Sequence, residues 1–195
     1  GVFNLKELLD LENRVETLSL TAGVRYDRYD DVGSTANPRF GMVYAPVKQL
    51  YFKALYGTAF RAPSFGEMYI RNNPSVIGNE NLKPEEIRTA EFLMGYSLSE
   101  KISGSIMYFR TRVDELIQAS GMTYENKGKM EGSGVEAELR INFDNYKYAY
   151  CNMTWQRVEN TTHSVILSPA GQSYAHDDLD PGNYARFIGN IGVNY

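Results

Sequence analysis

The stretch "GVEAELRINF", residues 134–143, alternates polar or small side chains with apolar ones at every step. The apolar set shares one side of an extended chain and consists of Val135, Ala137, Leu139, Ile141 and Phe143. Successive side chains of a β-strand point to opposite faces, so this period of two predicts a strand with one apolar and one polar face.

The same alternation recurs along most of the chain. The further segments that show it, regularly or less so, are 17–29, 38–46, 50–60, 89–98, 102–115, 147–159 and 186–195. Together with 134–143 they predict about eight strands. Most are about 9–13 residues long, which exceeds the ~5–6 usual in soluble sheets and matches the ~9–11 that cross a bilayer within a barrel. Residues 1–16 form an ill-defined lead-in whose four leucines leave room for a short helix.

The connections between these segments alternate in length. Short joins fall at 45–49, 98–101 and 144–146, and longer ones at 30–37, 61–86, 116–130 and 160–183. An up-and-down transmembrane barrel has short turns on its periplasmic side and long loops outside, which produces this order. The pattern therefore favours an all-β, antiparallel portion of such a barrel over a soluble β-sandwich or adhesin-like binding module, which stays the alternative.

The composition is that of a folded chain, with 43% hydrophobic and 23% charged residues among 195. The net charge of −4 and the lack of a dense Lys/Arg cluster argue against a nucleic-acid partner. The single cysteine, Cys151, rules out an internal disulfide and is expected to be a packing residue. No apolar run reaches the ~18 residues of a membrane helix, so membrane association must come from strands or from a segment outside this chain.

The polar face of the predicted strands carries charges that suit a wet barrel lumen. The residues assigned to this lumen-facing wall are Arg25, Lys53, Glu91, Glu136, Glu138 and Arg140. Charge costs little on a lumen wall and several kcal/mol on a lipid face, so the apolar set is expected to face lipid. A soluble antiparallel sheet with one solvated face alternates in the same way and remains open at this point.

Several stretches resemble the barrel of TonB-dependent outer-membrane receptors. The two most specific are "YGTAFRAPSFGEMY" (56–69) and "GNENLKPEEIRTAEFLMGY" (78–96), which look like the Phe-Arg-Ala-Pro and Asn-Pro-Asn-Leu boxes of that family. Further pieces in order are "LSLTAGVRYD" (18–27), "NPRFGMVY" (37–44), "YFRTRVDELI" (108–117), "NKGKMEGSGVEAEL" (126–139) and "ARFIGNIGVNY" (185–195). The likeness spans about 17–195, although Glu80 stands where the second box has proline.

This resemblance implies an energised importer of the bacterial outer membrane, and not an enzyme. Such a receptor has a barrel of about 22 strands and an N-terminal plug, binds a ferric siderophore, haem or cobalamin outside, and imports it through TonB. The expected partners are the plug domain, the TonB complex acting through it, outer-membrane lipid with lipopolysaccharide, and most of all a ferric siderophore or similar chelate. The chain shows no plug or TonB box, so we expect residues 1–195 to be part of the barrel domain and Tyr195 to be a truncation point.

Candidate ligand-binding residues lie in the long joins of the chain. They are Arg61, Tyr69, Arg71, Lys83, His163 and His176. Residues 62–78 hold no histidine where haem importers resembling this chain place one, which favours a siderophore over haem. Tyr69 could ligate ferric haem but is expected to pack in its loop, and Arg61 is expected to anchor its own loop.

No cofactor or metal site is predicted. The acidic run "HDDLDPGN" (176–183) lacks the spacing of an EF-hand and is expected to be a solvated loop. Ser164 next to His163 raises the alternative of a barrel hydrolase, but adjacent strand residues point to opposite faces and place this pair poorly.

Overall fold

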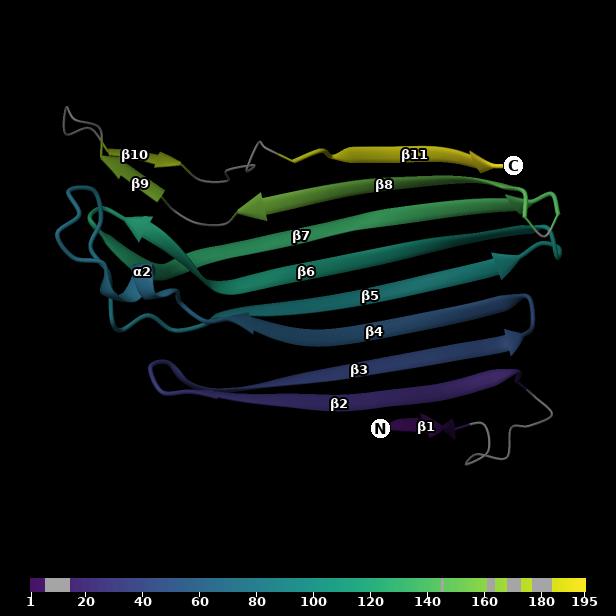
Figure 1. Ribbon diagram of the computed structural model, residues 1–195, viewed down its shortest axis with the longest axis horizontal. Helices are drawn as coiled ribbons and strands as arrows, with labels where there is room; N and C mark the ends of the chain where they lie inside the picture. Colours follow the sequence, from purple (N-terminus) through teal and green to yellow (C-terminus); the bar gives the residue numbers. More distant parts are fainter. Residues whose placement is uncertain (6–14, 145, 161–163, 168–172, 177–183) are drawn as a thin grey trace.

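The computed structural model describes residues 1–5, 15–144, 146–160, 164–167, 173–176 and 184–195. Within these residues, nine strands form one sheet in the order β1-β2-β3-β4-β5-β6-β7-β8-β11, and β9 pairs with β10 apart from it (Figure 1). The strands are β1 (Val2–Asn4), β2 (Thr17–Tyr29), β3 (Gly33–Val47), β4 (Leu50–Arg61), β5 (Glu85–Ser97), β6 (Ile102–Ser120), β7 (Thr123–Asn142), β8 (Tyr148–Asn160), β9 (Ser164–Leu167), β10 (Ser173–His176) and β11 (Phe187–Asn194).

The prediction of an all-β, antiparallel, up-and-down fold is confirmed. Each strand of the sheet pairs antiparallel with the strands beside it. The eight predicted segments correspond to β2 to β8 and β11, and β1 lies in what was expected to be a lead-in. The expected short helix of that lead-in lies largely outside the described residues. Among the residues that the structure describes, no helix is long and apolar enough to span a membrane.

Two of the predicted long joins are wrong, because the strands extend into them. β2 and β3 leave only residues 30–32 between them, and β6 and β7 leave only Gly121 and Met122. The added residues break the alternation, since Leu116 and Ile117 are adjacent apolar residues and 126–129 is polar or small on both faces. They therefore show no period of two, but a backbone ladder does not need that pattern. The β2–β3 and β6–β7 connections are therefore as short as the turns at the opposite end of the sheet, whereas β4 and β5 remain joined by the long segment 62–84.

The pairing register separates the side chains into an apolar face and a polar face. One row of paired residues on the apolar face crosses β2 to β8 and β11: Leu20, Met42, Ala54, Phe92, Tyr108, Val135, Trp155 and Phe187. Most of these side chains are exposed, including Trp155 at 52%. Such a band without a protein partner is suited to contact with lipid.

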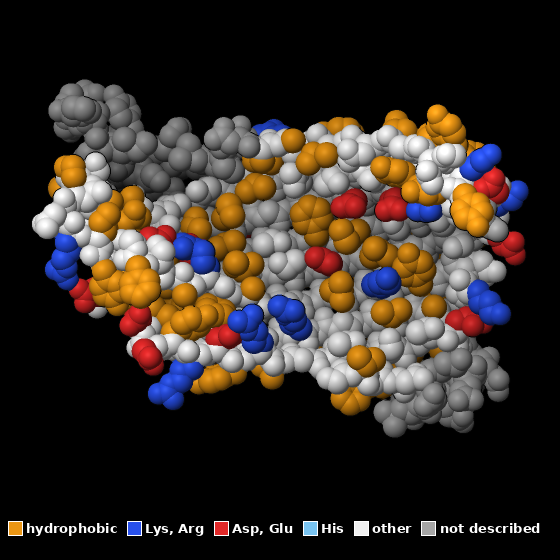
Figure 2. Space-filling model, in the orientation of Figure 1, with side chains coloured by type: hydrophobic (Ala, Val, Ile, Leu, Met, Phe, Trp, Pro, Cys, Tyr) orange, Lys and Arg blue, Asp and Glu red, His pale blue; other side chains and the backbone are white. Residues whose placement is uncertain are grey.

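The polar face carries all six residues that the sequence assigned to a lumen wall. The register runs from Lys53 to Leu93, Met107 and Glu136, which puts Lys53 and Glu136 on one face. Glu91, Glu138, Arg140 and Arg25 lie on it by the same parity. Figure 2 looks onto this face, where acidic and basic side chains are scattered over the middle of the sheet. Its role as a lumen wall stays a prediction.

Two glycines of the polar face make room for aromatic rings on the next strand. Tyr51 pairs with Gly95, and a Cβ at Gly95 would lie 2.2 Å from Tyr51 Cζ. Phe109 pairs with Gly134, where a Cβ would lie 2.6 Å from Phe109 Cζ. Each ring therefore covers the bare backbone of the facing strand, an arrangement that helps to fix register.

We expect the substitution Gly95→Val to destabilise the barrel by about 1–3 kcal/mol, the usual cost of forcing a side chain into filled space. Gly23→Val is the matched control, because Gly23 lies on the same face and a Cβ added there would meet nothing within 4 Å. The measurement is urea unfolding of the full-length receptor in detergent micelles. Equal midpoints for the two variants would contradict the proposed contact between the ring and the glycine.

Candidate functional site

The segment between β4 and β5, residues 62–84, contains a short helix, α2 (Phe65–Tyr69). Ser64 caps it: the Ser64 Oγ accepts a hydrogen bond from the Glu67 backbone N–H at 3.3 Å. In return, the Glu67 carboxylate accepts one from the Ser64 N–H at 2.7 Å. This reciprocal capping box fixes the start of α2. The helix was not predicted, although Ser64 and Glu67 at this spacing are its sequence signal.

Arg61, at the end of β4, ties this segment to the sheet. Its guanidinium donates to both Glu85 oxygens, at 2.7 Å from Nε and 2.5 Å from Nη2, and to Glu67 at 3.0 Å from Nη1. Glu85 also accepts from the Ile117 N–H at 2.9 Å, and its side chain is only 6% exposed. Arg61 therefore joins β4 to α2 and β5 directly, and to β6 through Glu85.

These contacts also set the ionisation of the carboxylate at the cap. Burial raises the pKa of Glu67, but hydrogen bonds from Arg61 and from Ser64 lower it by more, so the pKa lies below its ordinary value. The pKa of Arg61 is raised by its hydrogen bonds to Glu85 and Glu67. Both groups therefore carry full charge at neutral pH.

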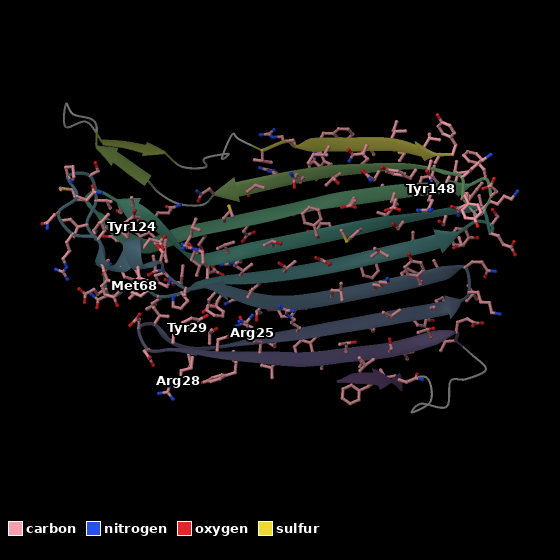
Figure 3. All side chains as sticks on the ribbon, viewed as in Figure 1. Arg25, Arg28, Tyr29, Met68, Tyr124 and Tyr148 are labelled. Atoms are coloured by element: carbon pink, nitrogen blue, oxygen red, sulfur yellow. The ribbon has the colours of Figure 1, made fainter. Side chains whose placement is uncertain are left out.

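The far side of the segment docks on the extended part of β6 and β7. Met68, Leu82 and Ile117 form a small buried cluster with Val32 and Tyr124 packed against it, and Figure 3 shows Met68 and Tyr124 close to each other at this end. Backbone and amide groups add hydrogen bonds along the seam. They join Ile77 N to Met122 O (2.7 Å), Asn79 Nδ2 to Tyr124 O (2.9 Å), Lys83 N to Asn126 Oδ1 (2.8 Å) and Asn126 Nδ2 to Lys83 O (2.9 Å).

An aromatic pair remains exposed on this docked segment. Phe65 is 78% exposed and Tyr69 37%, and their ring centroids lie 5.7 Å apart. Burial raises the pKa of the Tyr69 hydroxyl, and Asp31 and Glu80 raise it further. The hydroxyl is therefore protonated at neutral pH, which suits hydrogen bonding or stacking better than ligation of iron as a phenolate.

The other predicted ligand residues differ in whether their side chains form ion pairs. Arg71 forms an exposed ion pair with Glu80. The Lys83 side chain is exposed, and no ion pair to it occurs among the described residues. His163 lies outside the described residues, and His176 belongs to β10 with its side chain outside them. The ligand-binding role of all these residues stays a prediction.

On the polar face, three carboxylates stand without a cationic partner. Glu91, Glu136 and Glu138 form no ion pair within the part of the chain that the structure describes. Two cations of the same face contact aromatic rings instead: Lys53 Nζ lies 5.2 Å from the Tyr51 ring centroid, and Arg140 Cζ lies 3.9 Å from the Tyr148 ring centroid. The carboxylates are therefore available to an external partner.

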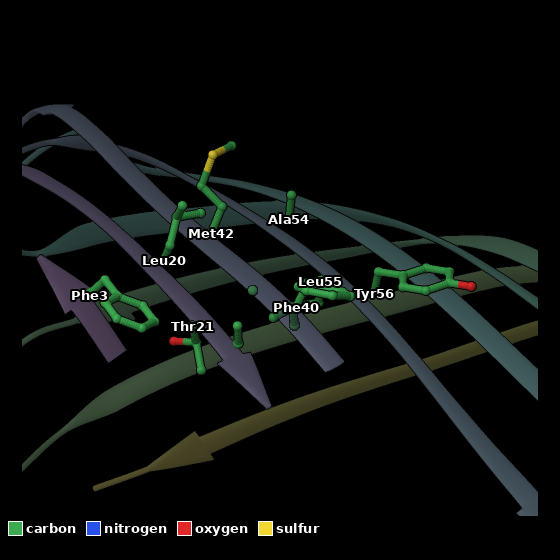
Figure 4. A pocket seen from close by; sticks show the side chains of 10 residues that line it. Phe3, Leu20, Thr21, Phe40, Met42, Ala54, Leu55 and Tyr56 are labelled. Carbon is green, nitrogen blue, oxygen red and sulfur yellow. The ribbon is translucent and has the colours of Figure 1, made fainter. Parts of the chain in front are cut away.

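The remaining features carry little reaction chemistry. A shallow depression of about 440 Å³ between β1 and β4 is lined by apolar groups such as Phe3, Leu20, Phe40 and Met42 (Figure 4). Among the described residues, no three His, Cys, Asp or Glu side chains gather closely enough to hold a metal ion. The pair formed by His163 and Ser164 cannot be placed, because His163 and the Ser164 side chain lie outside the described residues.

Comparison with known proteins identifies the family. The family model described as "TonB dependent receptor-like, beta-barrel" matches residues 8–195. The chain belongs to the TonB-dependent receptor β-barrel family. This family consists of transporters and receptors of the bacterial outer membrane, in agreement with the resemblance of the two sequence boxes.

Individual relatives of this TonB-dependent receptor barrel cover only part of it. The vitamin B12 transporter BtuB of Vibrio cholerae is 34% identical over 120 residues, which are 60% of this chain and 19% of that protein. The siderophore receptor PirA of Pseudomonas aeruginosa has the same fold, with a TM-score of 0.63, 24% identity, and coverage of 73% of this chain and 29% of that one. The RagAB peptide importer superposes with a TM-score of 0.64 at 16% identity, covering 82% and 23%. The chain thus spans about 19% of the length of the curated relative.

We expect Arg61→Ala to release segment 62–84, because it leaves the buried Glu85 carboxylate without its charged donor at a cost of about 1–3 kcal/mol. Arg71→Ala is the matched control, since the Arg71–Glu80 pair is exposed at 72% and 54%, and surface pairs contribute little. Hydrogen exchange of residues 62–84 in the full-length receptor measures the effect. Equal protection in the two variants would show that Arg61 does not anchor the segment.

Proposed function

We propose that this chain is part of an outer-membrane receptor that captures a scarce nutrient at the cell surface and imports it with TonB-coupled energy. The nutrient of this proposal is a ferric siderophore or a similar metal chelate. The sheet would continue into the rest of a larger barrel, with the apolar face toward lipid and the polar face toward the lumen. The family assignment supports this class of protein. The choice of nutrient is supported by the side chains that segment 62–84 exposes.

The observation that carries the proposal is the position of the docked segment. Segment 62–84 packs on the buried side chain of Ile117, and Arg61 and Glu85, which hold it, lie on the continuation of the polar face beyond the apolar band. Figure 1 shows α2 at the end of the sheet where β6 and β7 meet. If the polar face lines a lumen, this segment stands at its outer mouth, where a ligand would arrive.

The exposed groups on the segment suit an aromatic, anionic chelate. Phe65 and Tyr69 offer rings for stacking, and the neutral Tyr69 hydroxyl can donate a hydrogen bond. Lys83 adds a positive charge that no carboxylate among the described residues neutralises. Cobalamin is the second candidate, because the 34% identity to a vitamin B12 transporter extends over 60% of the chain.

We expect the full-length receptor to bind a ferric tris-catecholate, and the double variant Phe65→Ala/Tyr69→Ala to bind it about tenfold more weakly, as loss of an aromatic anchor of ~1.4 kcal/mol implies. The control is Phe143→Ala/Tyr146→Ala, which removes two rings exposed at 55% and 82% at the opposite end of the sheet. Ligand-induced quenching of protein fluorescence gives the affinities. Binding of cyanocobalamin without binding of any ferric siderophore would overturn the choice of nutrient.

The three unpaired carboxylates support a second part of the proposal, that the polar face holds a plug domain. Carboxylates in a water-filled channel need no partner, but a domain that fills the channel must compensate them, because unpaired charges at a dry interface are costly. Glu91, Glu136 and Glu138 would therefore face Lys or Arg side chains of the plug.

We expect Glu91→Gln/Glu136→Gln/Glu138→Gln to speed release of the plug in urea several-fold, since the isosteric amides keep the packing and lose the charge. The control is Glu86→Gln/Glu131→Gln/Glu159→Gln, which removes the same charge from the apolar side of the sheet. Susceptibility of the plug to protease cleavage in the full-length receptor measures the rate of release. The same acceleration in both variants would mean that the plug responds to net charge and not to these carboxylates.

A further inference from the structure

A short motif recurs on the apolar face of three strands, near the loop end that carries α2. Tyr26 is followed two residues on by Arg28 on β2, Tyr108 by Arg110 on β6, and Trp155 by Arg157 on β8. Residues two apart in a strand share a face and lie about 7 Å apart along it. In all three strands the arginine lies on the loop-end side of the ring.

These motifs mark the place where the apolar face ends. Towards the opposite end of the sheet, the same face carries Val24 and Leu20 on β2, Ile106 on β6, and Met153 and Cys151 on β8, with no charged side chain. Beyond the arginines the face turns to ion pairs, such as Arg88–Glu86 and Arg112–Asp114. Aromatic side chains gather at the edge of the hydrocarbon layer, so the three rings lie at that edge and the arginines at headgroup level.

The three arginines keep hydrogen-bonding capacity free. Arg110 and Arg157 each donate through Nη2 to one carboxylate, Glu131 and Glu159, both at 2.6 Å, and their side chains are 57% and 66% exposed. Arg28 is exposed and has no ion pair among the described residues, and Figure 3 shows it pointing away from the sheet. A guanidinium has five N–H donors in a planar fork that matches phosphate, so each retains donors for an anion.

The first charged groups outward from the rings on these strands are therefore cations. On this face of β6 to β8, carboxylates appear only further out, at positions such as Glu131 on β7 and Glu159 on β8. Arg110, Ser133 and Arg157 stand in one row of paired residues across β6, β7 and β8, about 5 Å between neighbours. The row offers two guanidinium groups and a hydroxyl side by side at the level where lipid phosphates lie.

We propose that Arg28, Arg110 and Arg157, each above its aromatic ring, bind the phosphate groups of outer-leaflet lipid headgroups and so fix the depth of the barrel in the membrane. The occupant is a phosphorylated lipid, because the rings and the apolar face supply a surface for acyl chains directly below the arginines. This inference rests on the proposed function, in that it requires the apolar face to contact the membrane. It goes beyond that function by assigning three arginines of this face to the binding of lipid phosphate.

The test uses the full-length receptor in detergent micelles, titrated with diphosphoryl lipid A and followed by native mass spectrometry. Arg28→Gln/Arg110→Gln/Arg157→Gln is expected to weaken retention of the lipid at least tenfold, as loss of several basic residues near an anionic lipid surface implies. The matched control Arg25→Gln/Arg39→Gln/Lys53→Gln removes three cations from the polar face and is expected to retain the lipid as the wild type does.

Unchanged retention in the first variant, or equal loss in both variants, would overturn the proposal. Inorganic phosphate is the second probe: binding as tight as that of the lipid would mean a free-anion site and would equally overturn it. Outer-membrane fractionation and heat-modifiable gel mobility of the wild type test separately whether the receptor is an outer-membrane barrel, as the proposed function requires. A wild type absent from the outer membrane would refute that function, while the micelle titration still reports on the arginines themselves.

Discussion

The structure depends on one constraint: a backbone that crosses hydrocarbon must satisfy its N–H and C=O groups within the sheet. The paired registers of β2 to β8 run through the apolar band without interruption. Among the described residues, register shifts occur only between Tyr44 and Val47, near one end of the band, and beyond Val113 on β6, past the other. Irregular backbone is thus confined to places where water can replace a lost hydrogen bond.

This ladder explains why the two faces can differ so sharply in chemistry. With side chains alternating across the sheet, every charge must be on one face if the other is to meet lipid. The polar face then accommodates Lys53, Glu91 and Glu136 beside large rings, and glycines such as Gly95 let those rings lie against the backbone. The apolar face becomes charged only where the strands have left the band, at positions such as Arg110.

Sequence reasoning predicted the part of the fold that the bilayer imposes and missed the part that it does not. Alternation such as that of 134–143 revealed the faces because one face must be apolar throughout. Beyond the band, stretches such as Asn126–Lys129 are polar on both faces, so the extension of β6 and β7 left no period of two. The contact of Arg61 with Glu85 spans 24 residues, and no local pattern indicates such a partner. The helix α2 did leave a signal, Ser64 with Glu67 three residues later.

The extension of β6 and β7 changes what the loop between β4 and β5 can do. A free loop of 23 residues, 62–84, would have to be ordered by its ligand, and that ordering would reduce the affinity. Here the loop is already held by the cluster around Ile117, by the reciprocal bonds of Asn126, and by the carboxylates that Arg61 clamps. Lysine could not replace Arg61, because one ammonium lacks the planar fork that grips Glu85 with two donors and reaches Glu67 with a third. The exposed rings of Phe65 and Tyr69 therefore lie on a surface that is already ordered by folding. Under the proposed ligand-binding role, the ligand would not have to order this loop, and more of the interaction free energy would remain for binding.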